Sequence, residues 1–480
     1  MPLEEKRIVE LDDATRSIEY DGVPLSGDLS MQERLEIYRK LQERKRRKRA
    51  KKFPGPKTRK LLEKAKEVYA TNSASSRIIP VRGNGSFVID PDGFRFFDFH
   101  CDAGVNNLGR GNDTVQNALK KQLRTHNEFS EHHNAPSPLA LELAEILAEQ
   151  SPVAKPAKVF FSNSGAEANE AARKLCLAYR YRRGEKKRRK ALYFSNGFAG
   201  RTAGVLAATS SRPEVQRDPF WTHCDEENSI YLPYPRDGES WVQWSRAFEK
   251  IPLEEIDRVL IEVPCQGEGG IIPISEESLC SLFCGCRDQG ILIISDCVQT
   301  GMGRTGTLFG ADCFSWFKPD ILTMGKALGG GLPIGATIFR SDIDWLPGEH
   351  ANTFGGGPLV MSAALASYVE IKKLLASGAV GHLESKMKSW LISFCEFPIV
   401  TDFRGRGAMW AVDFISAEAR DRIKRVGEEC VEKTGCGLRL LSTGRTAIRL
   451  MPPLNTDLAM FSDVMGILRG VLEAVNEEMK

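Results

Sequence analysis

The fold of this chain is decided at a junction between strand and loop, residues 290–306, which reads GILIISDCVQTGMGRTG. The apolar run at its start predicts a buried strand, and Asp296 stands where the run ends. A second junction, residues 321–336, reads ILTMGKALGGGLPIGA and places Lys326 just beyond an apolar run and before a glycine-rich loop. In α/β proteins the sites lie beyond the carboxyl ends of strands, so both residues are candidates for function.

Around these junctions, apolar runs of strand length alternate with segments of helical period. From residue 113 onward the strand-like runs are KVFFSN, KALYFSN, DRVLIEV, GILIISD, DILTMGK and GATIFR. This alternation predicts an α/β fold, with a mostly parallel sheet and helices on both faces. Before it, residues 85–99 predict a hairpin whose turn is Pro91-Asp92-Gly93.

A lysine and an aspartate at strand ends suit pyridoxal 5'-phosphate (PLP). Lysine can form a Schiff base with this cofactor, and a buried carboxylate keeps the pyridine nitrogen protonated, so that the ring accepts electrons. Each residue alone has a simpler explanation, because an aspartate at a strand end commonly caps a turn and a lysine is commonly solvated. The residues around the pair decide between these interpretations.

The two junctions resemble the class III (subgroup II) aminotransferases, PLP enzymes of fold type I that include 4-aminobutyrate and ornithine aminotransferases. The family patterns are roughly Asp-Glu-Val-Gln-Thr-Gly-x-Gly-Arg-Thr-Gly and Lys-x-Leu-Gly-Gly-Gly-x-Pro-Ile-Gly-Ala. The resemblance extends from about Pro54 to about Pro453. It implies a large PLP-binding domain with a mostly parallel sheet, and a smaller α+β domain built from both ends of the chain.

The resemblance and the composition together predict four segments. An N-terminal extension, partly helical and basic, comes first, and the N-terminal part of the small domain follows it. The large domain and the C-terminal part of the small domain complete the chain. The predicted boundaries, in that order, are 1–52, 53–112, 113–375 and 376–480.

Further positions match cofactor contacts of the family. Residues 160–169, FFSNSGAEAN, read as a strand, a tight turn and the start of a helix. A helix N-terminus suits a phosphate, although an ordinary capped helix has the same pattern. The resemblance assigns phosphate binding to Ser164, Gly165 and Ala166.

Three more residues take roles from the resemblance. Phe198 stacks on the cofactor ring, and Gln299 hydrogen-bonds the ring oxygen. Thr353 reaches the phosphate of the neighbouring subunit's cofactor. This last role implies a homodimer or a larger homo-oligomer with shared active sites.

A glutamate and an arginine match the substrate-binding pair of the family. The matched residues are Glu268, in PCQGEGG, and Arg449, in TAIRLMPPL. In the family, the glutamate masks the arginine when the substrate amine lies far from the α-carboxylate. It moves away when the substrate resembles glutamate. A surface ion pair is the alternative interpretation.

The chain departs from the family pattern at several polar positions. Glu262 is next to Val263, which stands where the family has Glu. Successive strand side chains point to opposite faces, so we expect that Glu262 does not substitute directly for that Glu. The PLP-binding residues are kept, so the departures affect the expected substrate more than the cofactor. The departures are Ala199 in place of His or Trp, Arg110 in place of His, Val263 and Cys297 in place of Glu, and Gly357 in place of Asn.

The main functional hypothesis is a PLP-dependent aminotransferase that acts on an ω-amino acid such as 4-aminobutyrate or ornithine. Lys326 would form the Schiff base and move a proton, Asp296 would hold the ring nitrogen charged, and a 2-oxo acid, 2-oxoglutarate first among them, would accept the amine. A racemase or epimerase of the same family is the alternative. A PLP-binding or nucleic-acid-interacting homologue without turnover is a third hypothesis, motivated by the departures and a basic N-terminal run.

The basic run, residues 44–52, reads RKRRKRAKK within a helix that we expect over 31–52. It can be a solvated face, a contact for an anionic surface or nucleic acid, or a contact for a partner subunit. The solvated face is favoured, because such runs are usually solvated and no aromatic residue interrupts this one. With a net charge of +3, the whole chain is not expected to bind polyanions, and nucleic acid is not an expected partner.

Composition predicts a globular cytoplasmic protein. Hydrophobic residues make up 42% and charged residues 27% of the 480 residues. The 12 cysteines show no paired CxxC spacing, so we expect reduced thiols; a zinc site at Cys280, Cys284 and Cys286 lacks a second group of ligands. No apolar stretch approaches the length of a transmembrane helix, and the N-terminus does not read as a targeting signal.

Overall fold

The computed structural model describes residues 19–20, 23–24, 52–70, 76–125, 135–185, 187–223 and 226–480. The chain divides into two compact units, Met1–Gly55 and Pro56–Lys480. In the first unit, β1 (Glu19–Tyr20) pairs antiparallel with β2 (Val23–Pro24). Except for Lys52, the helix expected over 31–52 and the basic run lie outside the described residues.

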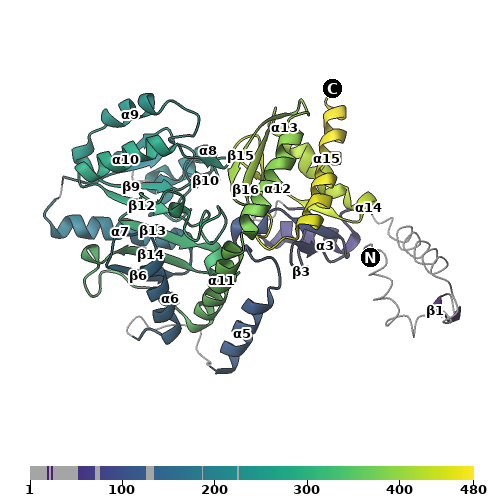
Figure 1. Ribbon diagram of the computed structural model, residues 1–480, viewed down its shortest axis with the longest axis horizontal. Coiled ribbons are helices and arrows are strands. Elements are labelled where there is room, and N and C mark those ends of the chain that lie inside the picture. Colours follow the sequence, from purple (N-terminus) through teal and green to yellow (C-terminus); the bar gives the residue numbers. More distant parts are fainter. Residues whose placement is uncertain are drawn as a thin grey trace. The chain divides into compact units, whose positions relative to one another are not determined.

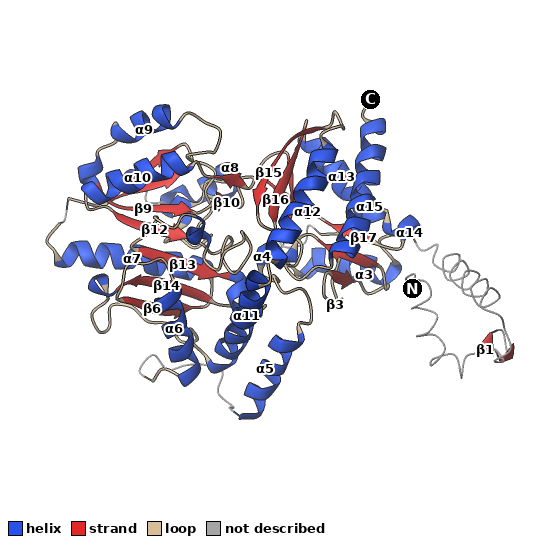
Figure 2. Ribbon diagram, in the orientation of Figure 1, coloured by secondary structure: helices blue, strands red, loops and turns tan. Residues whose placement is uncertain are grey.

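The second unit is built on a seven-stranded sheet (Figures 1 and 2). One strand, β14, is antiparallel to both of its neighbours, and the remaining pairs are parallel. The predicted mostly parallel sheet is therefore confirmed. In spatial order the strands are β6 (Ala157–Ser162), β14 (Gly335–Arg340), β13 (Ile321–Gly325), β12 (Leu292–Asp296), β9 (Ile256–Glu262), β7 (Lys190–Phe194) and β8 (Ser229–Leu232).

Helices cover both faces of this sheet because its central strands are apolar on both sides. Leu292 and Ile294 belong to a cluster with α7 (Gly165–Arg182), whereas Ile293 belongs to a larger cluster on the other face. This alternation is what a strand with period two produces. The helices that contribute buried residues to the larger cluster are α5 (Asp113–Thr125), α6 (Pro138–Gln150), α9 (Trp241–Glu249), α10 (Glu276–Asp288) and α11 (Pro358–Ala376).

A separate core joins the two ends of the chain. Phe97 and Phe99 pack with buried residues from Val380 to Val475. One sheet has the order β15 (Val400–Arg406), β16 (Met409–Phe414), β19 (Ala447–Leu450) and β18 (Leu441–Thr443). The other has the order β17 (Gly437–Arg439), β5 (Arg95–Asp98), β4 (Phe87–Ile89) and β3 (Arg82–Asn84). The helices here are α12 (Ala379–Phe394), α13 (Ala417–Glu429), α14 (Val431–Thr434) and α15 (Leu458–Glu478).

The hairpin expected within residues 85–99 is present as β4 and β5, which pair antiparallel. Because β17 pairs in parallel with β5, residues from near the two ends of the chain share one sheet. The exact domain boundaries at 53, 113 and 376 stay predictions.

The shorter elements connect these layers. One of them is α3 (Pro56–Val68), whose Leu61 and Val68 side chains are 41% and 72% exposed. Among the described residues, no helix is long and apolar enough to cross a membrane. Cys280 and Cys284 are exposed on α10, whereas Cys286 is buried. The remaining short elements include α4 (Cys101–Gly104), α8 (Pro213–Gln216), β10 (Cys265–Gln266) and β11 (Ile272–Pro273).

Candidate active site

Lys326 and Asp296 stand at the carboxyl ends of two adjacent parallel strands. Asp296 is the last residue of β12, and Lys326 follows the last residue of β13 directly. Lys326 has a φ of 47°, a left-handed conformation that costs energy for a residue with a side chain and is typical of functional sites. Burial lowers the pKa of Lys326, and the nearby Arg449 lowers it further, against the opposing carboxylates. A lowered pKa favours the neutral amine, which is the nucleophilic and basic form of lysine.

The Asp296 carboxylate is buried and held from two sides. Oδ1 accepts from the Val298 backbone N–H at 2.9 Å, and Oδ2 accepts from Asn169 Nδ2 at 2.7 Å. Burial raises the pKa of Asp296, while these two hydrogen bonds oppose the rise. A protonated ring nitrogen placed beside this carboxylate would stabilise its charge in the same way, so the site suits the pyridine nitrogen of PLP.

Sequence reasoning missed Asn169, which connects three parts of the site. Its Nδ2 donates to the Ala199 carbonyl at 3.0 Å as well as to Asp296. Its Oδ1 accepts from Thr323 Oγ1 on β13 at 2.7 Å. Asn169 is only 1% exposed, on a stretch of α7 otherwise rich in buried alanine. The one signal for this role in the sequence was a lone amide on the buried face of a helix.

The start of α7 lies beside the end of β12. Ser164 caps the helix, and its Oγ accepts from the Glu167 backbone N–H at 3.2 Å. Gly165 is packed so closely that a Cβ there would lie 2.5 Å from Val298 Cγ1. The first N–H groups of a helix have no partners within the helix, and with Ala166 this turn offers such groups to an anion. The three predicted phosphate residues are therefore next to the Asp296 loop.

Glu262 corrects one expectation. It is the last residue of β9 and pairs in register with Asp296, and neighbours in register on parallel strands point to the same face. Its Oε1 accepts from the Phe198 backbone N–H and its Oε2 from the Gly267 backbone N–H, both at 2.9 Å. Alternation along a strand shows only that the Glu262 and Val263 side chains point to opposite faces. The prediction took Glu262 to be the one that points away from the site, which is wrong. Burial and the neighbouring Asp296 raise the pKa of Glu262 to about 8.

Two of the departures from the family pattern lie together in the core. Val263 and Cys297 both belong to the large apolar cluster, and the Cys297 thiol is 3.8 Å from the Val263 carbonyl oxygen. Two carboxylates in this environment would need partners, whereas a valine and a thiol do not. These two substitutions therefore change the packing on the face of the sheet that the large apolar cluster covers.

Phe198 and Ala199 belong to a loop that Asn169 connects to Asp296. The Phe198 ring is half-buried, with the Arg201 guanidinium 5.2 Å from its centroid. Ala199 is buried and its N–H donates to Thr209 Oγ1 at 3.1 Å. Gly357, another departure, is the N-cap of α11.

Glu268 and Arg449 form an ion pair of 2.7 Å, between Oε2 and Nη2. The side chain of Arg449, on β19, is 1% exposed and that of Glu268 25% exposed. Burial alone would raise the pKa of Glu268, but Arg449 lowers it to about 2. Nε and Nη1 of Arg449 are buried and have no hydrogen-bond partner among the described residues. The guanidinium thus keeps two donors for a ligand carboxylate, and it could bind one bidentately once Glu268 releases Nη2.

Gln299 and Thr353 are the two remaining predicted site residues. The Gln299 side chain is buried, and its Nε2 donates to the Ala103 carbonyl at 2.8 Å. Thr353 is exposed, in the loop before α11, unlike the other predicted cofactor residues of the described chain. Its neighbour Asn352 donates through Nδ2 to the Phe161 carbonyl at 2.7 Å.

Comparison with known proteins assigns a family to this arrangement. Residues 68–472 match the model of the aminotransferases of class III. The chain belongs to this family. It is a PLP-dependent aminotransferase, and pyridoxal 5'-phosphate is its cofactor.

Individual relatives agree with the family assignment. The chain is 31% identical to an acetylornithine aminotransferase of Clostridium acetobutylicum over 400 residues, 80% of this chain and 94% of the relative. It is 35% identical to an acetylornithine aminotransferase of Methanocaldococcus jannaschii over 383 residues, 78% of this chain and 89% of the relative. The ornithine aminotransferase of Toxoplasma gondii has the same fold, with a TM-score of 0.75 and 24% identity over 88% of this chain and 96% of that chain.

Proposed function

We propose that this aminotransferase acts on an amino acid with a terminal (ω) amine, of the ornithine type or 4-aminobutyrate, and passes the amine to a 2-oxo acid, first of all 2-oxoglutarate. The observation that carries this proposal is the Glu268–Arg449 pair, in which two Arg449 donors have no partner among the residues that the structure describes. A 2-oxo diacid needs a cation for its α-carboxylate, and an ω-amine donor needs that cation masked. The relatives named for acetylornithine and ornithine support the ω-amine class.

Three site residues would carry the chemistry. Pyridoxal phosphate, when bound, supplies an electron sink that stabilises negative charge on the substrate carbon next to the amine. Lys326 would bind the cofactor, and its Nζ, whose pKa burial lowers, would take the proton from that carbon. Asp296 would hold the proton of the ring nitrogen, with Asn169 fixing the orientation of its carboxylate.

Other residues would seat the cofactor without taking part in proton transfer. Ser164, Gly165 and Ala166 would bind the phosphate at the α7 N-terminus, and Phe198 would cover the ring. Gln299 would donate to the ring oxygen. We also infer a homodimer, in which the exposed Thr353 reaches the phosphate of the neighbouring subunit's cofactor. Light scattering of the loaded protein tests this, since a monomer at working concentration contradicts it.

The first experiment is the absorption spectrum of the PLP-loaded protein with single amino acids and no 2-oxo acid. The panel contains ornithine, acetylornithine, 4-aminobutyrate, lysine, alanine and leucine. An ω-amine donor should remove the visible band, and 2-oxoglutarate should then restore it. If no ω-amine removes the band while an α-amino acid does, the proposed substrate class is wrong. If the band persists and the D-enantiomer accumulates, the protein is a racemase.

A further inference from the structure

Three consecutive residues that are not glycine have left-handed backbone conformations beside the candidate site. They are Cys101, Asp102 and Ala103, with φ angles of 43°, 50° and 59°. Each such residue is energetically unfavourable and persists only where the surrounding structure determines it. Three in succession indicate that surrounding residues hold this turn in its conformation.

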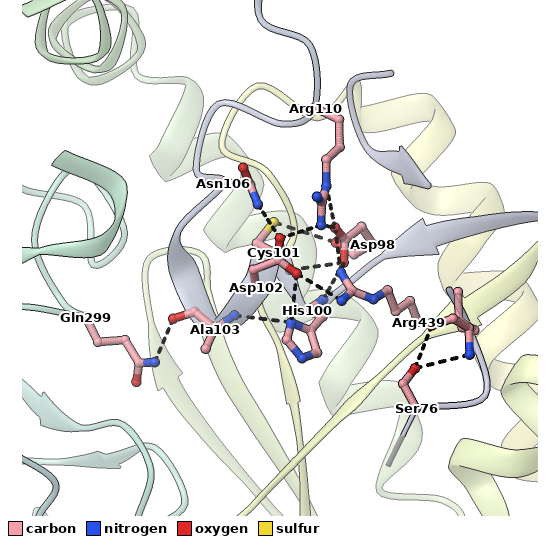
Figure 3. Close-up of polar contacts among 11 residues, drawn as sticks. Ser76, Asp98, His100, Cys101, Asp102, Ala103, Asn106, Arg110, Gln299 and Arg439 are labelled. Atoms are coloured by element: carbon pink, nitrogen blue, oxygen red, sulfur yellow. Dashed lines mark hydrogen bonds and ion pairs between the residues drawn. The ribbon is translucent and has the colours of Figure 1, made fainter. Parts of the chain in front are cut away.

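Two aspartates and two arginines hold this turn (Figure 3). Asp98 Oδ1 accepts from the backbone N–H groups of His100 and Cys101, at 3.1 and 3.0 Å. The Asp102 carboxylate lies between two guanidinium groups: Oδ1 accepts from Arg439 Nη2 at 2.9 Å and Oδ2 from Arg110 Nη2 at 2.7 Å.

Both arginines also reach Asp98, each at 3.1 Å. Arg439 stands beside Asp98 because β17 and β5 pair in register at these residues. Arg110, a departure from the family pattern, therefore has a defined structural partner in Asp102. The lock is buried on one side, since Asp98 is 1% exposed. We call these four residues the turn lock.

The turn acts on Gln299. The Ala103 carbonyl accepts from Gln299 Nε2 at 2.8 Å (Figure 3). The opposite end of the amide faces Gly267, where a Cβ would lie 1.7 Å from Gln299 Oε1. An amide nitrogen carries two hydrogens, so a second donor remains on Nε2 after the bond to Ala103. The Ala103 carbonyl thereby fixes the orientation of the Gln299 amide, because it accepts from the Nε2 end.

We propose that Asp98, Asp102, Arg110 and Arg439 are positioning residues, which hold the 101–103 turn so that Gln299 presents an N–H, and not its carbonyl, to the ring oxygen of PLP. The inference rests on the proposed role of Gln299. The ring oxygen is negatively charged in the bound cofactor, so a donor stabilises it and a carbonyl would repel it. When the turn is released, the amide can rotate and the donor is lost.

The pH titration of the visible absorption of the PLP-loaded protein tests this. With PLP bound through Lys326, a donor to the ring oxygen would favour the deprotonated form of the chromophore. Losing one hydrogen bond to a charged atom should raise the midpoint by about one pH unit. The test variants are Asp102→Asn, whose side chain also tolerates a left-handed backbone, and Arg110→Gln. The matched control is Arg422→Gln, which breaks the exposed pair with Glu478 and should leave the midpoint unchanged.

A double variant shows whether the lock acts through Gln299. Gln299→Leu alone should raise the midpoint by a similar amount, and adding Asp102→Asn should raise it no further. A further rise in the double variant, or an unchanged midpoint in both lock variants, overturns the inference. If the wild type binds PLP without a visible band that depends on Lys326, the proposed function fails instead. Far-ultraviolet circular dichroism and cofactor stoichiometry verify that each variant is folded and loaded.

Discussion

Arg449 contacts Glu268 through Nη2 alone, and Nε and Nη1 of this buried guanidinium have no hydrogen-bond partner within the described part of the chain. A carboxylate with a pKa near 2 is ionised at neutral pH, so Glu268 neutralises Arg449 in the absence of substrate. The pair can therefore present either a neutral surface or, when Glu268 moves away, a cation with a planar fork of donors. One site can then accept an ω-amine donor, which needs the cation masked, and a 2-oxo diacid, which needs a cation for its α-carboxylate.

Replacing Glu268 with glutamine should separate the two half-reactions. The amide keeps the shape but not the charge, so Arg449 stays a cation when an ω-amine donor binds. We expect kcat/KM for the ω-amine donor to fall about tenfold, as for the loss of one charged hydrogen bond, and that for glutamate to be unchanged or higher. The control is Glu478→Gln, at an exposed ion pair. Equal losses for both substrates would contradict the masking role.

Removing the Lys326 amine should abolish turnover. In Lys326→Ala we expect the visible absorption of covalently held PLP to disappear, and the rate to fall at least about a thousandfold, because both the covalent attachment and the base are lost. Absorption and a single-turnover assay with ornithine measure the two effects. Lys373→Ala, at an exposed lysine on α11, is the control. Substantial remaining activity would refute the assignment of Lys326.

The Asn169 bridge gives a prediction for stability. Asn169→Leu removes the hydrogen bonds of Asn169 to Asp296, Thr323 and the Ala199 carbonyl and should lower the free energy of unfolding of the apoprotein by about 1–3 kcal/mol. Thr323→Val removes only the bond from Oγ1 to Asn169 and should cost less, about 0.5–1.5 kcal/mol. Urea unfolding measures both. If the two variants cost the same, the bonds from Asn169 to Asp296 and to the Ala199 carbonyl contribute nothing measurable.

The contact of Gly165 with Val298 predicts a rescue. A Cβ at 165 would lie 2.5 Å from Val298 Cγ1, so Gly165→Ala should destabilise the apoprotein by about 1–3 kcal/mol and weaken PLP binding. Shortening the neighbour with Val298→Ala should recover most of both losses. The unfolding free energy and the PLP dissociation constant are measured for the two single variants and the double variant. A double variant as weak as Gly165→Ala would show that the strain lies elsewhere.

The sequence predicted those parts of the site that local patterns describe. Asp296 and Lys326 each end an apolar run, and Ser164 opens a helix, so each could be placed on an element before the structure was known. The turn lock could not, because Arg439 and Asp98 are 341 residues apart and meet only when β17 joins β5. Glu262 was misplaced because alternation gives no absolute direction until the register with Asp296 is known.

Glu262 gives a prediction for pH dependence. Its pKa is about 8 in the folded protein and 4.5 when unperturbed, so the folded state binds the proton more tightly. Its contribution to the free energy of unfolding is therefore complete below about pH 4.5 and lost as the pH rises through 8. Between pH 5 and pH 8, wild-type apoprotein should lose more stability than Glu262→Gln, by on the order of a few kcal/mol. Urea unfolding at both pH values gives the two differences, with exposed Glu478→Gln expected to keep the wild-type slope. Equal slopes in the wild type and Glu262→Gln would mean that the N–H groups of Phe198 and Gly267 keep Glu262 ionised throughout.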